Sequence, residues 1–206
     1  MESKLFTPVT FGPLTLRNRT IRSAAFESMC PGNAPSDMLL NYHRSVAAGG
    51  IGMTTVAYAA VTRSGLSFDR QLWMRPEIIP GLRRLTDAVH AEGAAAGIQL
   101  GHCGNMSHKS ICGCTPVGAS GGFNLYSPTF VRGLRADELP ELARAYGRSV
   151  NLAREAGFDA VEIHAGHGYL ISQFLSPATN HRKDEFGGSL QNRMRFMDMV
   201  LEEVMK

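Results

Sequence analysis

The sequence lacks long apolar runs, strong charge and a cysteine framework. No apolar stretch reaches the roughly 18 residues of a membrane span, and Met1-Glu2-Ser3-Lys4 does not begin a secretory signal. The net charge is +3 and the basic residues are scattered, so we expect neither a nucleic-acid nor a membrane partner. Four cysteines in 206 residues do not indicate disulfide staples, and a cytoplasmic protein is expected. A 44% hydrophobic, 19% charged composition excludes a disordered or collagen-like chain.

Short apolar strands alternate with amphipathic helices along the chain. After an N-terminal hairpin over 5–16, we expect strands at 20–26, 51–56, 94–100 and 158–164 and helices at 38–48, 80–92, 138–156 and 189–206. Ser36-Asp37, Asp137 and Ser189 are the expected helix caps. Four strand–helix units predict a parallel sheet covered on both faces, with a long loop over 101–136.

The connections from strand to helix are long and polar, whereas those from helix to strand are short. Chemistry in α/β barrels and in open doubly wound sheets sits in such strand-to-helix loops, and periodicity does not choose between the two folds. A dinucleotide-binding Rossmann fold is disfavoured because Glu27-Ser28-Met29-Cys30-Pro31-Gly32 follows the first strand in place of Gly-x-Gly-x-x-Gly.

His164 and His167 follow the fourth predicted strand, with Tyr169 two residues further on. Two imidazoles at this position can polarise one carbonyl or nitro oxygen, and a phenol can supply a proton. The alternative is that these side chains only cap the loop. A metal site is less favoured, because only Glu162 stands nearby as a third ligand.

Two further segments carry polar or thiol side chains. Gln99 ends the third strand and suits either a heterocycle edge or a satisfied strand-end amide. The spacing of His102, Cys103, His108, Cys112 and Cys114 matches no zinc or iron–sulfur pattern, so we expect a flexible loop with incidental thiols and no metal. The charged run 180–189 is expected to be a solvated, loop-ordering ion network.

Several longer motifs resemble the Old Yellow Enzyme family. They are His164-Ala165-Gly166-His167-Gly168-Tyr169-Leu170-Ile171-Ser172-Gln173-Phe174-Leu175-Ser176-Pro177, the run 180–189 with Asn192-Arg193, Leu5-Phe6-x-Pro8, Leu14-x-Leu16-Arg17-Asn18-Arg19, Gly49-Gly50-Ile51-Gly52 and Gln99-Leu100-Gly101-His102. The match is colinear over nearly the whole chain. This family comprises FMN-dependent NAD(P)H oxidoreductases, or ene-reductases, built on a TIM barrel.

The resemblance implies a (β/α)8 TIM-barrel type α/β fold of which only the first four units are present, so that 1–206 forms the N-terminal part of one FMN-binding domain. It implies flavin contacts for Ser23, Ala24, Ala25 and Tyr58, and a hydrogen bond from Gln99 to the pyrimidine edge. His164 and His167 are then expected to bind the substrate oxygen. NAD(P)H reduces FMN, flavin N5 gives hydride to the β-carbon of an activated alkene or enone, and Tyr169 protonates the α-carbon.

Departures from the family pattern leave the substrate and the choice of NADH or NADPH open. Phe26 stands where members carry Thr or Cys, Tyr58 replaces a small residue, and Asn105 replaces a frequent Arg. A full barrel takes about 250 residues, and the family's phosphate-binding strands seven and eight are not in this chain. We therefore expect a homodimer or a complementing C-terminal half-barrel. The alternatives are a non-catalytic half-barrel that acts through self-association or a partner, and a metal-binding protein that uses His164, His167 and the cysteine loop.

Overall fold

The structure is a computed structural model that describes residues 3–206; Met1 and Glu2, in the stretch where no secretory signal is expected, lie outside the described residues. The chain forms two compact units. The first contains the described residues up to 59, with 70–99 and 151–162, and the second contains 60–69, 100–150 and 163–206.

The first unit begins with the predicted hairpin and contains most of the main sheet. Strands β1 (Val9–Phe11) and β2 (Leu14–Leu16) pair antiparallel, which confirms the hairpin. The main sheet has the order β10-β6-β4-β3, with β5 paired to β4. Its strands are β3 (Ile21–Arg22), β4 (Met53–Ala60), β5 (Leu72–Trp73), β6 (Ala95–Gly101) and β10 (Ala160–Ile163). The 3-10 helices of this unit are η1 (Lys4–Phe6), η2 (Pro31–Asn33) and η4 (Pro76–Ile78).

The main sheet is parallel, as predicted. Strands β3 and β4 pair in parallel register. The residue numbers of the hydrogen-bonded partners rise together along β4 and β6. Ala95 N donates to Gly52 O at 2.9 Å at one end, and Val61 N donates to Gly101 O at 3.0 Å at the other, which is the pattern of parallel strands. Within residues 3–206 the strand order runs from β10 to β3 without closing on itself, and the α/β class is confirmed.

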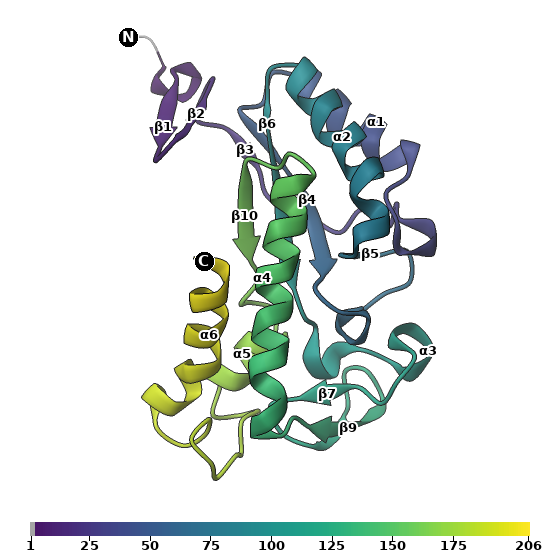
Figure 1. Ribbon diagram of the computed structural model, residues 1–206, viewed down its shortest axis with the longest axis vertical. Coiled ribbons are helices and arrows are strands. Elements are labelled where there is room, and N and C mark those ends of the chain that lie inside the picture. Colours follow the sequence, from purple (N-terminus) through teal and green to yellow (C-terminus); the bar gives the residue numbers. More distant parts are fainter. Residues whose placement is uncertain (1–2) are drawn as a thin grey trace. The chain divides into compact units, whose positions relative to one another are not determined.

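The predicted strand 20–26 is wrong beyond Arg22, because side-chain bonds replace the ladder there. The Arg22 guanidinium donates to Thr55 O (2.7 Å) and Ala25 O (3.2 Å), and the chain continues as coil. Helices α1 (Asp37–Ala48) and α2 (Ile79–Ala91) cover this part of the sheet side by side (Figure 1). Ser36 Oγ accepts from Leu39 N at 3.2 Å, which confirms the predicted cap of α1.

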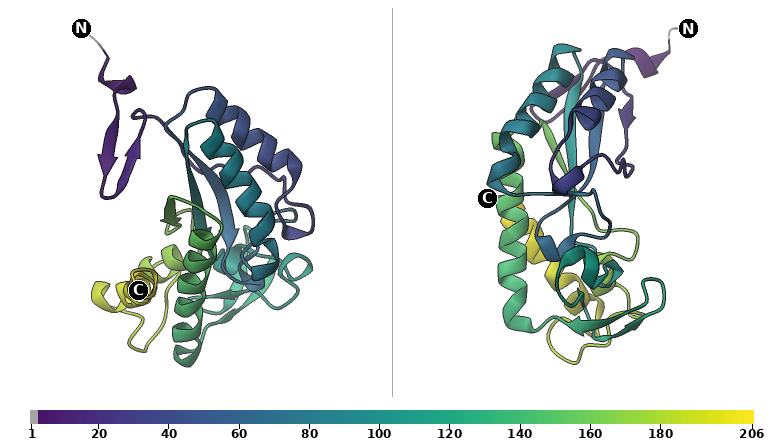
Figure 2. Two further views of the ribbon diagram at one scale, coloured as in Figure 1. Left: turned by 45° about the horizontal axis from the view of Figure 1, so that its top comes forward. Right: turned by 90° about the vertical axis from the view of Figure 1, so that its right-hand side faces the viewer.

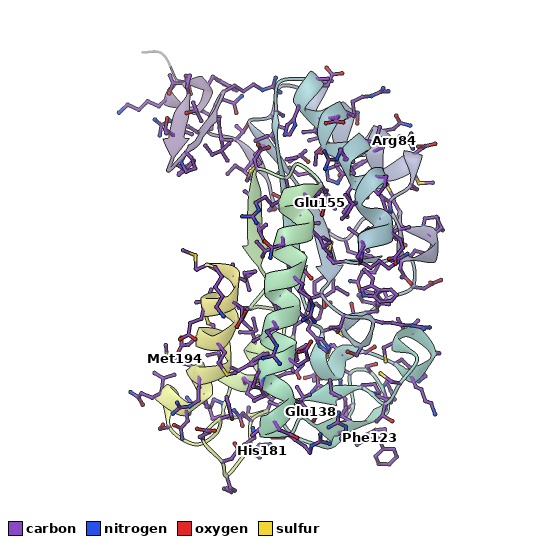
Figure 3. The ribbon with its side chains drawn as sticks, viewed as in Figure 1. Arg84, Phe123, Glu138, Glu155, His181 and Met194 are labelled. Carbon is purple, nitrogen blue, oxygen red and sulfur yellow. The ribbon has the colours of Figure 1, made fainter. Side chains whose placement is uncertain are left out.

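The segment predicted as a loop over 101–136 is ordered in the second unit. It contains η5 (Gly104–Met106), α3 (Lys109–Cys112) and a small sheet of order β7-β9-β8, with β7 (Val117–Gly118), β8 (Gly122–Asn124) and β9 (Thr129–Gly133). Phe123 faces Phe130 across β8 and β9 with ring centroids 5.2 Å apart. Both rings are exposed, and Figure 3 shows Phe123 projecting from the hairpin. The sequence did not predict these strands because their apolar side chains do not alternate toward a core.

The second unit also contains residues 139–150 of α4 (Leu139–Glu155), together with α5 (Leu170–Leu175), α6 (Leu190–Val204), η3 (Arg63–Gly65) and η6 (Ala136–Glu138). The Phe174 and Phe196 rings join α5 to α6, with centroids 4.7 Å apart. Gly147 gives α6 a close approach to α4, since a Cβ there would lie 2.9 Å from Glu203 O (Figure 2).

The predicted cap of α4 by Asp137 is wrong. Asp137 lies inside η6, where its carboxylate accepts from the Arg135 guanidinium at 3.0 Å, and Glu138 accepts from Arg135 N at 2.8 Å. The predicted Ser189 cap of α6 is confirmed, because Ser189 Oγ accepts from Asn192 N. None of the helices in the described chain is both long and apolar enough for a membrane crossing.

Candidate active site

His164, His167 and Tyr169 come together in the second unit. His164 directly follows β10, and its backbone N–H donates to Leu100 O at 2.8 Å, so a sheet bond fixes its position. His164 Nε2 lies 3.0 Å from His167 Nδ1, and the ring centroids are 4.9 Å apart. His164 is buried while His167 is exposed. The pair therefore presents two ring nitrogens close enough to bind one oxygen atom.

A tight turn aims His167. His167 and Gly168 both adopt left-handed backbone angles, with φ of +56° and +66°, and Tyr169 N donates to Gly166 O at 3.0 Å. A non-glycine residue in this region costs of order 1 kcal/mol, and such residues cluster at functional sites. The turn lets His164 and His167 lie adjacent although only two residues separate them.

Tyr169 packs edge-on against His164 with ring centroids 5.1 Å apart. Its hydroxyl lies 3.2 Å from Ser67 Oγ. Burial raises the pKa of Tyr169, and the hydrogen bond from Ser67 opposes that shift. The phenol therefore stays protonated at neutral pH and is able to donate a proton.

Gln173, to which the sequence assigned no role, holds this turn from α5. Its buried amide Nε2 lies 2.6 Å from Gly168 O, 3.1 Å from Cys103 O and 2.9 Å from Asn105 Oδ1. Its Oε1 accepts from Asn105 N at 3.2 Å. Gly104 adopts φ +64° and any Cβ there would collide with the Gln173 amide. Gln173 thus joins the chain after β6 to the chain after β10, and Asn105 takes part in this joint.

The remaining predicted site residues belong to the first unit. Gln99 Nε2 donates to Glu162 Oε1 at 2.6 Å across the neighbouring strands β6 and β10. Both interpretations of Gln99 stay open, because its amide nitrogen is bonded within the sheet while its amide oxygen is a second group that can accept a hydrogen bond. Tyr58 is buried in β4. Ser23, Ala24 and Ala25 follow β3 as a short run of small side chains, of which Ser23 and Ala25 are exposed.

A buried charge cluster in the first unit was missed by the sequence reasoning. Glu27 Oε1 lies 3.0 Å from Arg22 Nη1 and 3.3 Å from His43 Nε2, and accepts from Ala57 N at 3.3 Å. His43 Nε2 lies within ion-pair distance without hydrogen-bond geometry, while its Nδ1 lies 2.8 Å from Thr54 Oγ1. The only signal in the sequence was a carboxylate directly after the first strand. The cluster fixes the chain that carries Ser23–Ala25.

The predicted solvated ion network over 180–189 is wrong for two of its members. The Arg182 side chain is buried, bonds to Ala119 O and Leu134 O, and pairs with Asp184. That guanidinium lowers the pKa of Asp184. The buried Asn180 amide donates to Phe174 O and Phe186 O, at 2.8 and 2.7 Å. Arg182 satisfies two loop carbonyls, and Asn180 satisfies one carbonyl in the last turn of α5 and one in the following loop, so both side chains order the backbone.

The metal-site hypothesis depends on a cluster of ligands among the residues that the structure describes. No three His, Cys, Asp or Glu side chains there are grouped to hold an ion. His164 and His167 therefore lack a third ligand within residues 3–206, and their ring nitrogens are placed for hydrogen bonding.

The chain has clear relatives in sequence and in fold. The sequence profile of the NADH:flavin oxidoreductase / NADH oxidase family matches residues 4–206, and the chain belongs to this family. It is 44% identical over 200 residues to the 4,4'-dithiodibutanoate disulfide reductase of Rhodococcus erythropolis, covering 97% of this chain and 50% of that protein. It is 37% identical to the NADPH dehydrogenase of Bacillus subtilis, covering 99% of this chain and 60% of that enzyme.

Solved structures place the chain among the old yellow enzymes. The old yellow enzyme homologue of Zymomonas mobilis superposes with a TM-score of 0.91 at 30% identity, covering 98% of this chain and 60% of that one. Morphinone reductase in complex with tetrahydroNAD gives 0.91 at 29% identity, with the same coverage. The predicted family membership is confirmed. The chain spans between half and about three fifths of the length of these four proteins.

The cofactors of this family are FMN and NAD(P)H. The residues present fit a flavin. Ser23, Ala24 and Ala25 follow β3 as small side chains, of which Ser23 and Ala25 are exposed, and Gln99, two residues before the end of β6, carries an amide of the kind that bonds a heterocycle edge. His164 and His167 offer donors for a second, oxygen-bearing molecule.

Proposed function

We propose that this chain is the N-terminal part of an FMN-dependent NAD(P)H oxidoreductase of TIM-barrel type that reduces activated alkenes such as enones. The observation that carries the proposal is the convergence of two imidazoles and a protonated phenol at one strand end. Such a set suits an acceptor whose oxygen gains negative charge while a neighbouring carbon gains a proton.

FMN, when bound, supplies the hydride chemistry between NAD(P)H and the acceptor. The residues proposed to hold its ring are Ser23, Ala24, Ala25, Tyr58 and Gln99. Those that hold its phosphate in the family belong to strands that this chain does not span. The proposed partner of residues 1–206 is a C-terminal half-barrel or a second copy of the chain.

The proposed role of His164 and His167 is to donate two hydrogen bonds to the acceptor oxygen. Since one ring nitrogen now faces the other at 3.0 Å, one of them acts as acceptor. An oxygen that bridges both nitrogens requires a proton on each, so binding entails a tautomer change or uptake of a proton. Both bonds strengthen as charge develops on that oxygen, which stabilises the transition state more than the bound acceptor. Tyr169, held by Ser67, then protonates the α-carbon.

A second acceptor class is a small disulfide, because a 44% identical relative is named as a disulfide reductase. A disulfide needs no oxygen-binding pair, so the two classes respond differently to changes at His164. Alkene reduction should depend on His164, whereas disulfide reduction should not.

The test uses the purified chain titrated with FMN, followed by titration of the complex with a phenol as an acceptor mimic. Variants H164A and H167A are compared with H181A, since His181 is exposed, lies outside the cluster and is held through its backbone N–H, which donates to Ser120 Oγ at 2.9 Å (Figure 3). Loss of one hydrogen bond to a phenolate costs about 1.5–3 kcal/mol, so phenol binding should weaken about 10- to 100-fold in H164A and H167A.

Phenol affinity in H164A equal to that in H181A would remove the imidazole pair from this role. A chain that binds no FMN, alone or with the family's C-terminal half, would instead support the non-catalytic half-barrel. Measurement of NADH and NADPH oxidation by the FMN complex then decides between the two reductants.

A further inference from the structure

Cys112 and Cys114 form a close thiol pair in the second unit. Their Sγ atoms lie 3.8 Å apart, and Cys112 Sγ also contacts Cys114 O at 3.2 Å. Gly113 between them closes α3 with φ +75°, and its N–H donates to Lys109 O at 2.9 Å. Residues two apart have Cα atoms no more than about 7 Å apart, and a turn shortens this into the disulfide range of about 4.4–6.8 Å.

The two thiols have different access to solvent. Cys112 is buried and Cys114 is exposed. Cys114 lines a cavity of about 620 Å³ together with Thr115, His102 and Arg132, whereas Cys112 does not line that cavity. A small molecule that enters the cavity therefore meets the Cys114 thiol first, and the Cys112 thiol is near enough to react in a second step.

We propose that Cys112 and Cys114 are a redox-active dithiol that exchanges with low-molecular-weight disulfides. The thiolate of Cys114 attacks one sulfur of a disulfide RS–SR, which releases RS⁻ and forms a mixed disulfide on Cys114. The thiolate of Cys112 then attacks Cys114 Sγ, which releases the second RS⁻ and forms the Cys112–Cys114 disulfide. The two cysteines lose two electrons and two protons, and RS–SR is reduced to two RSH.

The surroundings of the pair shift the pKa of Cys114, the thiol that attacks first. Burial and the adjacent Cys112 thiol raise the pKa of Cys114, while Arg63 and Arg132 oppose the shift. Burial raises the pKa of the neighbouring Cys103 to about 12, which keeps this third thiol protonated and slow to react. The pair rests on residues of the second unit alone and is independent of the flavin reaction.

The test uses the reduced 206-residue chain incubated with oxidised glutathione at about pH 8.5, the ordinary thiol pKa, then alkylated and digested with trypsin. The peptide 110–132 contains Cys112 and Cys114 and no other cysteine, whereas Cys103 lies in 85–109. We expect the peptide 110–132 to become two hydrogens lighter, with no alkylation and no retained glutathione.

The variant C112S removes the resolving thiol and C103S is its matched control. Because an intramolecular thiol acts at an effective concentration of millimolar or more, C112S should retain at least about tenfold more glutathione on Cys114 than either the wild type or C103S. A stable glutathione adduct in the wild type, a disulfide between 85–109 and 110–132, or full alkylation of all four cysteines would each overturn the proposal.

Discussion

Replacing Glu27 by alanine should destabilise the first unit strongly. The Glu27 side chain is 6% exposed and its partner Arg22 is 15% exposed, with 3.0 Å between their charged atoms. The substitution leaves the Arg22 guanidinium without its carboxylate and takes the acceptor from Ala57 N. Removal of one partner of a buried ion pair costs about 3–5 kcal/mol, and we expect about 3 kcal/mol because Arg22 keeps its carbonyl partners, Thr55 O and Ala25 O.

The assay is urea unfolding followed by the fluorescence of Trp73, the single tryptophan of the chain, which lies in β5 of the same unit. With a urea slope of about 2 kcal/mol per molar, the midpoint should fall by about 1.5 M. E27Q keeps the shape and one acceptor, so its shift should be smaller.

The matched control is R84A, which breaks the Arg84–Asp37 pair on the same unit. Arg84 is 68% exposed and the pair spans 2.9 Å at the surface (Figure 3). Exposed pairs contribute below about 1 kcal/mol, which corresponds to a shift under about 0.5 M. Equal shifts in E27A and R84A would show that burial of the Glu27 cluster does not stabilise the fold.

Three further predictions follow from single contacts. Y169F removes the proposed proton donor but keeps the ring, so alkene turnover by the FMN-loaded chain should fall about 10²–10⁴-fold while phenol binding persists; loss of both would point to a collapsed site. The hydrogen bond from Arg132 holds the pKa of Glu138 at about 2, so this carboxylate stabilises the fold fully above about pH 4.5 and progressively less as the pH falls toward 2; wild type and E138Q should differ in urea midpoint at pH 7 and converge near pH 2. G52A should lower thermal stability more than G12A, because a Cβ at Gly52 would lie 2.5 Å from Asn18 O, whereas a Cβ at Gly12 meets open space and only the φ of +55° costs about 1 kcal/mol; equal melting temperatures would contradict this.

Local sequence signals predicted most of the helices and the core of the candidate site. Ser36 and Ser189 cap α1 and α6 as expected, because capping depends on residues three positions apart. His164, His167 and Tyr169 cluster because one short turn contains them all. In each of these cases the determining interaction lies within a few residues along the chain.

Long-range partners could not be predicted in this way. Ser67 is 102 residues from Tyr169 in sequence, and Gln99 is 63 residues from Glu162. Neither pair leaves a periodic signal, and Glu27 shows its role only once the fold places it against Arg22. The buried state of Arg182 was likewise hidden inside a run of charges that composition alone marks as solvated.

The missed residues share one physical task, which is to satisfy backbone groups outside the sheet ladders. Arg22 bonds carbonyls beyond β3, Gln173 bonds Cys103 O and Gly168 O, and Asn180 bonds Phe174 O and Phe186 O. A buried carbonyl without a partner costs free energy, so these side chains allow irregular chain to stay ordered beside the strand ends. The turn that holds His167 at positive φ is one such segment. The geometry of the candidate site therefore depends on buried amides and guanidinium groups as much as on the histidines and the tyrosine themselves.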